Sequence, residues 1–318
     1  PQYFLYLFQN SYRSKIFYGI GRGVSNLGRW RLPADEFNNF FLPIPPLSEQ
    51  KQISDYLDRK TQQIDDLIEK TERKIELLKE QRSSLINQCV TKGLNPNVEM
   101  KDSGVEWIGE IPKGWTIGKL TKFLYPIVDY RGRTPEKTDE GIFLLTAKNI
   151  RNGKINYSRS TEFTTPEEQS KLNQRGKPEI SDVVFTTEAP LGQVANIDRT
   201  DIAIAQRVVK FRGKKDIVNN YFLKYWILSH CFQQNLATFS TGSTAEGIKA
   251  SKFGLLSLVV PPPSEQKQIS DYLDKETSKI DQMVDTETKR IDLLKEFRQS
   301  LISNVVTGKI DVRDEVIQ

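Results

Sequence analysis

The chain has 318 residues, of which 37% are hydrophobic and 10% aromatic, and its formal net charge is +5 at pH 7. This length allows two or three folded domains, and the composition excludes wholesale disorder, while two cysteines without a spacing pattern exclude a disulfide framework and favour a reducing compartment. No apolar run reaches the roughly 20 residues of a membrane span and no signal peptide is visible, so the sequence predicts a soluble cytoplasmic protein without a membrane partner.

The N-terminal segment, residues 1–47, matches a stretch near the end of the chain. Phe37 and Leu42 match Phe253 and Leu258 at an offset of 216 positions, and the triplet Tyr-Phe-Leu at 3–5 matches the one at 221–223 with a two-residue shift. We therefore predict that residues 1–47 are the C-terminal remnant of a first domain, whose complete copy lies at 101–263. Judged by that copy, about 120 further residues of the first domain would lie upstream.

The clearest feature is a duplicated helical segment. The sequence SEQKQISDYLD occurs at 48–58 and again at 264–274, and residues 48–91 match 264–307 at 25 of 44 positions. Both copies are rich in Glu, Lys, Leu and Ile and contain no Pro or Gly until Gly93 and Gly308, which predicts long helices at 48–91 and 264–308. Each helix follows a proline-rich run, and Ser48 and Ser264 are the expected N-caps.

Apolar residues recur at alternating steps of four and three along both copies, which is a coiled-coil pattern. Because so long a stripe cannot be buried by one helix alone, we predict that the two helices pair; a stripe that packs on its own globular domain is the alternative. Polar residues occupy equivalent positions of the pattern at Thr61 and Thr277 and at Arg82 and Arg298. The residues predicted to pair are Leu57, Ile64, Ile68, Ile75, Leu78, Leu85, Leu273, Ile280, Val284, Ile291, Leu294 and Leu301.

Between the helices, residues 92–100 form a Gly/Pro/Asn linker and residues 101–263 form a complete domain of mixed α and β structure. Residues 309–318 form a short tail. The fold class is predicted as α+β with a pseudo-two-fold internal duplication. Strands are expected at 115–119, 141–145, 183–186, 193–197, 202–211 and 256–260, and helices at 166–174 and 218–237.

Four loops of the complete domain, at 129–135, 147–154, 173–179 and 240–249, combine Arg and Lys with Gly, Asn, Ser and Thr. Glycine lets a backbone approach DNA, the cations neutralise phosphate, and Arg and Asn can contact guanine and adenine edges. Loops of this composition also occur on ordinary surfaces, so a solvated surface is nearly as good an interpretation. The candidate DNA-facing residues are Arg131, Arg133, Lys148, Asn149, Arg151, Lys154, Thr241, Ser243 and Lys249, with Arg22 and Arg29 in the N-terminal segment.

The sequence offers little for catalysis. His230 is the only histidine, no His/Cys cluster has metal-ligand spacing, and the Walker P-loop pattern is absent. Asp182 and Glu188 flank a predicted strand as nuclease carboxylates can, but no lysine is placed to complete such a site. We therefore predict no catalytic residue and no metal site. A cryptic nuclease, and a coiled-coil adaptor that binds proteins without reading DNA, remain the alternatives.

Several segments together resemble the specificity (HsdS-type) subunit of type I restriction–modification enzymes. These are the two helix starts PPLSEQKQISDYLD and PPPSEQKQISDYLD, the domain start GVEWIGEIPKGW, the loop DYRGRTP and the ending TGKIDVRDE. The resemblance covers essentially the whole chain. It implies two target recognition domains, each of which reads half of a bipartite double-stranded DNA site, separated by two antiparallel helices. Residues 48–91 would then be the central conserved region, and residues 264–308 the C-terminal one.

The resemblance also implies partners. They are two copies of the methyltransferase (M) subunit, which bind S-adenosylmethionine, and restriction (R) subunits, which use ATP and Mg and are recruited through the assembly of two M subunits with one specificity subunit. The chain itself would bind no cofactor and would be non-catalytic. Because it carries one complete recognition domain and a remnant, a second copy of the chain is a further expected partner if the natural protein is short.

Overall fold

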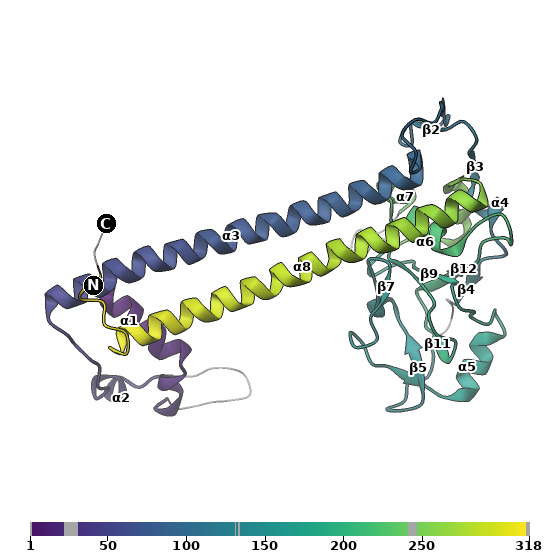
Figure 1. Cartoon of the computed structure of the whole chain (residues 1–318). Coiled ribbons are helices and arrows are strands. Elements are labelled where there is room, and N and C mark those ends of the chain that lie inside the picture. Colours follow the sequence, from purple (N-terminus) through teal and green to yellow (C-terminus); the bar gives the residue numbers. More distant parts are fainter. Residues whose placement is uncertain (1, 22–30, 131, 133, 241–246, 316–318) are drawn as a thin grey trace. The chain divides into compact units, whose positions relative to one another are not determined.

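The computed structural model describes residues 2–21, 31–130, 132, 134–240 and 247–315. The chain divides into two compact units: unit 1 contains residues 1–78 and 282–318, and unit 2 contains residues 79–281. Two long helices, α3 (Leu47–Lys92) and α8 (Pro263–Val306), each contribute to both units (Figure 1). The predicted α+β class with two long helices is therefore confirmed. None of the described helices is long and apolar enough to cross a membrane.

The two long helices pack together. In unit 1, Arg298 of α8 binds Asp65 of α3 with two hydrogen bonds of 2.9 and 3.1 Å, and Lys74 of α3 binds Glu287 of α8. Residue numbers rise along one helix as they fall along the other, so the helices run antiparallel. Eight of the predicted pairing residues are buried, namely Leu57, Ile64, Ile75, Leu78, Leu273, Ile280, Ile291 and Leu301. The other four, Ile68, Leu85, Val284 and Leu294, are half-buried.

The same contacts recur in both units. In unit 2, Arg82 Nε donates to Asp281 Oδ1 at 2.9 Å, which is the Arg298–Asp65 contact at an offset of 216. The side-chain amide of Gln50 donates to the carbonyl of Pro45 at 2.8 Å, and its counterpart Gln266 donates to that of Pro261 at 2.7 Å. The internal duplication therefore extends from sequence to individual side-chain contacts.

Both helices begin one residue earlier than predicted. The backbone N–H of Gln50 donates to the Pro46 carbonyl at 2.9 Å, and that of Gln266 donates to the Pro262 carbonyl at 3.1 Å. Ser48 and Ser264 therefore lie inside the first turn, and the expectation that they are N-caps is wrong. The reason is the preceding prolines, because the fixed φ of proline suits the start of a helix and extends each helix to Leu47 or Pro263.

Unit 1 also contains α1 (Gln2–Arg13), the 3-10 turn η1 (Ile16–Gly19) and α2 (Ala34–Asn38). The hydroxyl of Tyr6 in α1 donates to Asp58 at 2.6 Å, as Tyr225 in unit 2 donates to Asp274 at 2.5 Å. Asp58 and Asp274 are equivalent at the offset of 216, so Tyr6 corresponds to Tyr225. The residues of α1 therefore match those around Tyr225 with a shift of three residues relative to that offset. The predicted two-residue shift is wrong, and burial agrees, because Tyr3 is buried whereas Tyr221 is exposed.

Unit 2 contains a domain of mixed helices and strands, with the strands grouped in small sheets. A four-stranded antiparallel sheet has the order β10-β9-β12-β4, and a three-stranded sheet has the order β11-β5-β8, in which β11 and β5 are parallel. Pairs β13-β3, β6-β7 and β1-β2 complete the domain. The bounds are β1 Met100–Asp102, β2 Glu110–Pro112, β3 Thr116–Lys119, β4 Val128–Asp129, β5 Ile142–Leu145, β6 Ile150–Arg151, β7 Lys154–Ile155, β8 Phe163–Thr164, β9 Val183–Thr186, β10 Val194–Asn196, β11 Ile202–Ile204, β12 Val208–Phe211 and β13 Ser257–Val260.

Two predicted elements are each split in two. The strand expected at 202–211 breaks at Arg207, whose φ of 72° is left-handed and cannot continue a strand. The helix expected at 218–237 breaks at Ser229, whose hydroxyl accepts a hydrogen bond from Phe232 N at 3.2 Å and caps the second helix. The helices of unit 2 besides α3 and α8 are α4 Leu120–Phe123, α5 Pro166–Asn173, α6 Asn220–Leu228 and α7 His230–Ala237, with 3-10 turns η2 Ala147–Asn149 and η3 Ala250–Leu255.

Candidate nucleic-acid interface

The candidate interface lies where β5 and β11 end. Because these strands are parallel, the residues that follow them emerge at the same edge of the sheet. The backbone N–H of Ala205 donates to the Leu145 carbonyl at 2.9 Å and fixes the two chain ends side by side. Figure 1 shows β5 and β11 at the end of unit 2 remote from the start of α8.

A turn that follows β9 joins this edge. Thr187 donates to the carbonyl of Arg207 both from its backbone N–H, at 2.9 Å, and from its hydroxyl, at 3.1 Å. The backbone N–H of Ile248 donates in turn to the Thr187 carbonyl at 3.0 Å. The end of the 240–249 loop, with the exposed Lys249, is therefore held beside Arg207.

A cavity of about 230 Å³ opens between these segments, and we call it the β5–β11 cleft. Its walls carry the cations Lys137, Lys148 and Arg207, the amide of Gln206, two threonine hydroxyls and one carboxylate. The lining residues are Thr134, Pro135, Lys137, Leu144, Thr146, Ala147, Lys148, Glu162, Ala189, Ala205, Gln206 and Arg207.

The electrostatics of the cleft depend on two carboxylates. Glu162 lies 2.6 Å from Lys137 Nζ and 3.6 Å from Lys148 Nζ, and Arg207 Nε lies 2.9 Å from Glu188. Burial opposes ionisation of Glu162, but hydrogen bonds from Lys137 and Ser160 outweigh burial and hold the pKa of its carboxyl below the ordinary value. The cations are thus positioned by partners that are themselves charged.

Such a cleft can contact DNA in two ways. The lysine and arginine side chains can neutralise phosphates, while an arginine or glutamine can read guanine or adenine edges in the major groove. The amide of Gln206 makes no hydrogen bond with the residues that the structure describes, and it is half-exposed. Arg207, held in a left-handed conformation, is the kind of strained residue that concentrates at functional sites.

The structure places only some of the predicted DNA-facing residues. Lys148 lies at the cleft, Lys249 is exposed beside it, and Arg151 is half-exposed on β6. Six others, Arg131, Arg133, Thr241, Ser243, Arg22 and Arg29, lie outside the described residues.

Asn149 is a correction to the predicted set. It is fully buried, its amide donates to the carbonyls of Asn156 and Ser160 at 3.0 and 2.8 Å, and its oxygen accepts from Thr146. These hydrogen bonds connect Thr146, Asn156 and Ser160 through the Asn149 side chain and so fix the conformation of the loop. Asn149 therefore shapes the loop and presents no surface to DNA.

Lys154 does not line the β5–β11 cleft and contacts α8 instead. Its Nζ donates to Asp281 Oδ2 at 2.7 Å, and the same carboxylate accepts from Arg82 of α3. Arg82 also donates to the carbonyl of Asn152 at 3.1 Å. This part of the predicted interface instead attaches the domain to the helices within unit 2.

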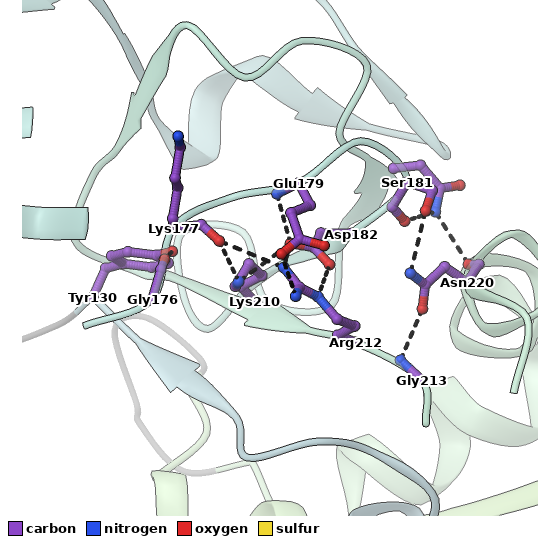
Figure 2. A network of polar contacts seen from close by, with 11 residues as sticks. Tyr130, Gly176, Lys177, Glu179, Ser181, Asp182, Lys210, Arg212, Gly213 and Asn220 are labelled. Atoms are coloured by element: carbon purple, nitrogen blue, oxygen red, sulfur yellow. Dashed lines mark hydrogen bonds and ion pairs between the residues drawn. The ribbon is translucent and has the colours of Figure 1, made fainter. Parts of the chain in front are cut away.

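The two carboxylates considered for a nuclease are engaged in ion pairs. Asp182 is 1% exposed and lies 3.2 Å from Lys210 Nζ, while Arg212 Nε donates to it at 2.6 Å (Figure 2). A lysine therefore does accompany Asp182, contrary to the prediction, but it is buried as well. Burial lowers the pKa of Lys210 below its ordinary value, although Asp182 opposes this shift. Glu188 is held separately by Arg207, and the described residues contain no group of three metal-ligating side chains.

Two of the three cations of the cleft, Lys137 and Arg207, and the amide of Gln206 were not predicted from the sequence. Arg207 and Gln206 were hidden because one continuous strand was predicted over 202–211. The available signal was the polar pair Gln-Arg between two apolar runs, IAIA and VV, which is a place for a strand to break.

The family model described as type I restriction modification DNA specificity domain matches residues 1–77 and 113–306. The specificity subunit of the type I restriction enzyme MjaVIII from Methanocaldococcus jannaschii is 26% identical over 289 residues, which are 87% of this chain and 64% of that protein. The putative MjaX specificity subunit of the same organism is 25% identical over 322 residues, which are 98% of this chain and 69% of that protein.

Two solved structures support the fold. A chain from a study titled "Structural basis underlying complex assembly and conformational transition of the type I R-M system" gives a TM-score of 0.70 with 13% identity, over 98% of this chain and 72% of that one. The HsdS subunit from Thermoanaerobacter tengcongensis gives a TM-score of 0.51 with 16% identity, over 98% of this chain and 71% of that one.

Proposed function

The chain belongs to the type I restriction modification DNA specificity family, and from this premise we propose that it is the non-catalytic DNA-specificity subunit of a type I restriction–modification system. The observation that carries the proposal is the β5–β11 cleft, because it gathers three cations and a glutamine amide from segments far apart in sequence at one sheet edge. Unit 2 would read one half of a bipartite DNA site.

The proposal assigns separate tasks to the cleft and to the helices. Lys148, Arg207 and Lys249 would contact phosphate, and Gln206 would read a base edge, together with Arg131 and Arg133 of the 129–135 loop. The duplicated helix starts would bind two methyltransferase subunits, through which restriction subunits are recruited. S-adenosylmethionine would be bound by the methyltransferase subunits, and ATP and Mg by the restriction subunits. The second recognition domain would come from further sequence or from a second copy.

The test is selection from a random-sequence DNA pool by the chain bound to its cognate methyltransferase subunit. A bipartite motif is expected if a second recognition domain is supplied, and a single short half-site if the chain acts alone. Absence of any selected sequence would contradict the proposal and favour the adaptor.

Substitution in the cleft separates DNA reading from folding. Lys148→Ala combined with Arg207→Ala should weaken binding to the selected site. The slope of log K against the logarithm of the salt concentration should become less steep by up to about 1.8, since each phosphate contact contributes about 0.9 to that slope. Lys215→Ala, an exposed change outside the cleft, is the matched control. An unchanged affinity and salt dependence would remove the cleft from the interface, even if selection succeeds.

A further inference from the structure

Unit 1 contains a cavity of about 390 Å³ where the start of α3 meets the end of α8. It is lined by the segment Pro43–Pro45, by Glu49 and Ile53 of α3, by Tyr3 of α1, and by residues 305–308 and 310–313 at and beyond the end of α8. This volume falls within the range of about 300–1,000 Å³ that is typical of binding pockets. Ile44, one of the lining residues, is 65% exposed.

The internal duplication supplies an equivalent place in unit 2. At the offset of 216, Glu49 corresponds to Glu265, Ile53 to Ile269, and the segment 43–45 to 259–261. The chain that follows each helix also corresponds, because Asp311 accepts a hydrogen bond from Arg313 N at 3.0 Å as Asn95 does from Asn97 N at 3.0 Å. The two walls are therefore built alike.

In unit 2 this place is organised around Trp115. Its side chain is buried, and its indole N–H donates to Glu265 Oε2 at 2.9 Å. The next residue, Thr116, pairs with Val260 in the β3–β13 ladder, and Val260 is only 8% exposed. A cavity remains there too, of about 420 Å³, but Trp115 and Pro112 form one of its walls.

The unit 1 wall has the same hydrogen-bonding capacity. The carboxylate of Glu49 makes no hydrogen bond with the described part of the chain. Its charge does act on Arg313: the pKa of that guanidinium is raised mainly by its hydrogen bond to Asp311, and Glu49 adds to the shift. Within unit 1, the described residues pair no strand with the segment 41–46.

The prolines of this segment are compatible with strand addition. In β13, Leu256 accepts from Leu120 N at 2.7 Å, so Leu256, Leu258 and Val260 direct their backbone groups towards β3, since strand residues alternate. Their counterparts are Phe40, Leu42 and Ile44, all of which keep an N–H. Pro43 and Pro45 fall at the alternate positions that point away, where an edge strand tolerates proline.

We propose that this cavity is a docking site for an extended polypeptide strand that carries tryptophan after a Pro-x-Gly turn, the chemistry of residues 111–119 (IPKGWTIGK). The indole N–H of the docked strand donates to Glu49, and its backbone pairs with Leu42 and Ile44 by strand addition. Burial of Ile44 against the added strand then reproduces the low exposure of Val260.

A peptide added to the full chain tests this directly. The peptide corresponds to residues 108–121, with blocked ends and a fluorescent label, and binding is followed by anisotropy. We expect saturable binding that weakens at least tenfold when the tryptophan equivalent to Trp115 is alanine, and at least tenfold with Glu49→Gln in the chain. Glu265→Gln is the matched control and should leave peptide affinity unchanged.

Disulfide trapping fixes the register. The chain with Ile44→Cys should cross-link to the peptide with Thr116→Cys, because their equivalents Val260 and Thr116 are cross-strand partners. Leu47→Cys, which is 83% exposed, should not cross-link, and the native Cys89 and Cys231 are buried. The proposal is overturned by absence of saturable binding, by indifference to Glu49→Gln, or by equal cross-linking at Leu47. Weakening by Glu265→Gln instead would also overturn it, because the peptide would then be displacing β3 of unit 2.

Discussion

Replacing Asp182 with asparagine should destabilise unit 2, because Asp182 neutralises two cations in the interior of the domain. Asp182 lies 3.2 Å from Lys210 Nζ and accepts from Arg212 at 2.6 and 2.7 Å and from the backbone N–H of Glu179 at 2.9 Å. The side chain of Lys210 is 5% exposed, so it cannot regain water when its partner is lost, whereas that of Arg212 is 28% exposed and keeps Glu179.

Removal of one member of a buried ion pair costs about 3–5 kcal/mol. Because Lys210 retains a 2.9 Å hydrogen bond to the Lys177 carbonyl and Arg212 retains Glu179, we expect the lower end, about 3 kcal/mol. Combining Asp182→Asn with Lys210→Met should recover at least half of this loss, since the double variant no longer buries an unpaired ammonium (Figure 2).

Urea unfolding followed by tryptophan fluorescence measures this effect, since Trp107, Trp115 and Trp226 all lie in unit 2. Glu188→Gln, which changes a half-exposed carboxylate paired only at the surface, is the matched control and should cost less than about 1 kcal/mol. A loss below about 0.5 kcal/mol for Asp182→Asn would refute the structural role. Metal-dependent DNA cleavage that disappears with either substitution would instead restore the nuclease interpretation.

Two further predictions concern the duplicated contacts. A double-mutant cycle on Arg298 and Asp65 should give a coupling free energy of about 0.5–1 kcal/mol. The cycle on the equivalent Arg82 and Asp281 should give at least as much, because these side chains are 16% and 26% exposed, against 23% and 47% for Arg298 and Asp65. Zero coupling in both cycles would show that the ion pairs do not stabilise the helix pairing. Burial raises the pKa of Tyr6 and Tyr225 above the ordinary value of 10, with Asp58 and Asp274 adding to the effect, so both keep their proton in the folded state when the unfolded chain has lost it. Their contribution to stability is therefore complete below pH 10 and is lost as pH rises above it; Tyr225→Phe should flatten this alkaline decline in a circular dichroism titration, and an unchanged slope would contradict the assignment.

The long helices were predictable because their signal is local. Periodic apolar residues such as Leu57 and Leu273 can be read from the sequence alone, and both are buried in the structure. The pairing of the two helices followed from the length of the stripe. The three-residue shift of Tyr6 relative to Tyr225 was not predictable, because it depends on which tyrosine reaches the aspartate and not on the best local match of letters.

The cleft could be predicted only in part, because its segments meet through long-range strand pairing. Lys148 and Arg207 are 59 positions apart, and they share one cavity only because β5 and β11 are parallel. Asn149 and Lys148 are neighbours in the same polar loop and were both predicted to face DNA, yet four hydrogen bonds hold the amide of Asn149 inside the domain. Residue type indicated loops 129–135 and 147–154, which both contribute to the lining of the cleft, whereas the direction of each side chain depends on the fold.

Packing does not explain why all eleven residues are identical at the two helix starts. Gln50, Leu57 and their counterparts are buried, and packing alone accounts for their identity. Lys51 and Lys267, however, have side chains 76% and 70% exposed, and they bind Asp55 and Asp271 in matched surface pairs. Packing places no constraint on such residues, and beyond residue 58 the two copies agree at only 14 of the remaining 33 positions. Retention of one surface on two otherwise diverging helices is the pattern expected if each helix start binds a like partner, which is why the proposed methyltransferase contacts belong to the first three turns of α3 and α8.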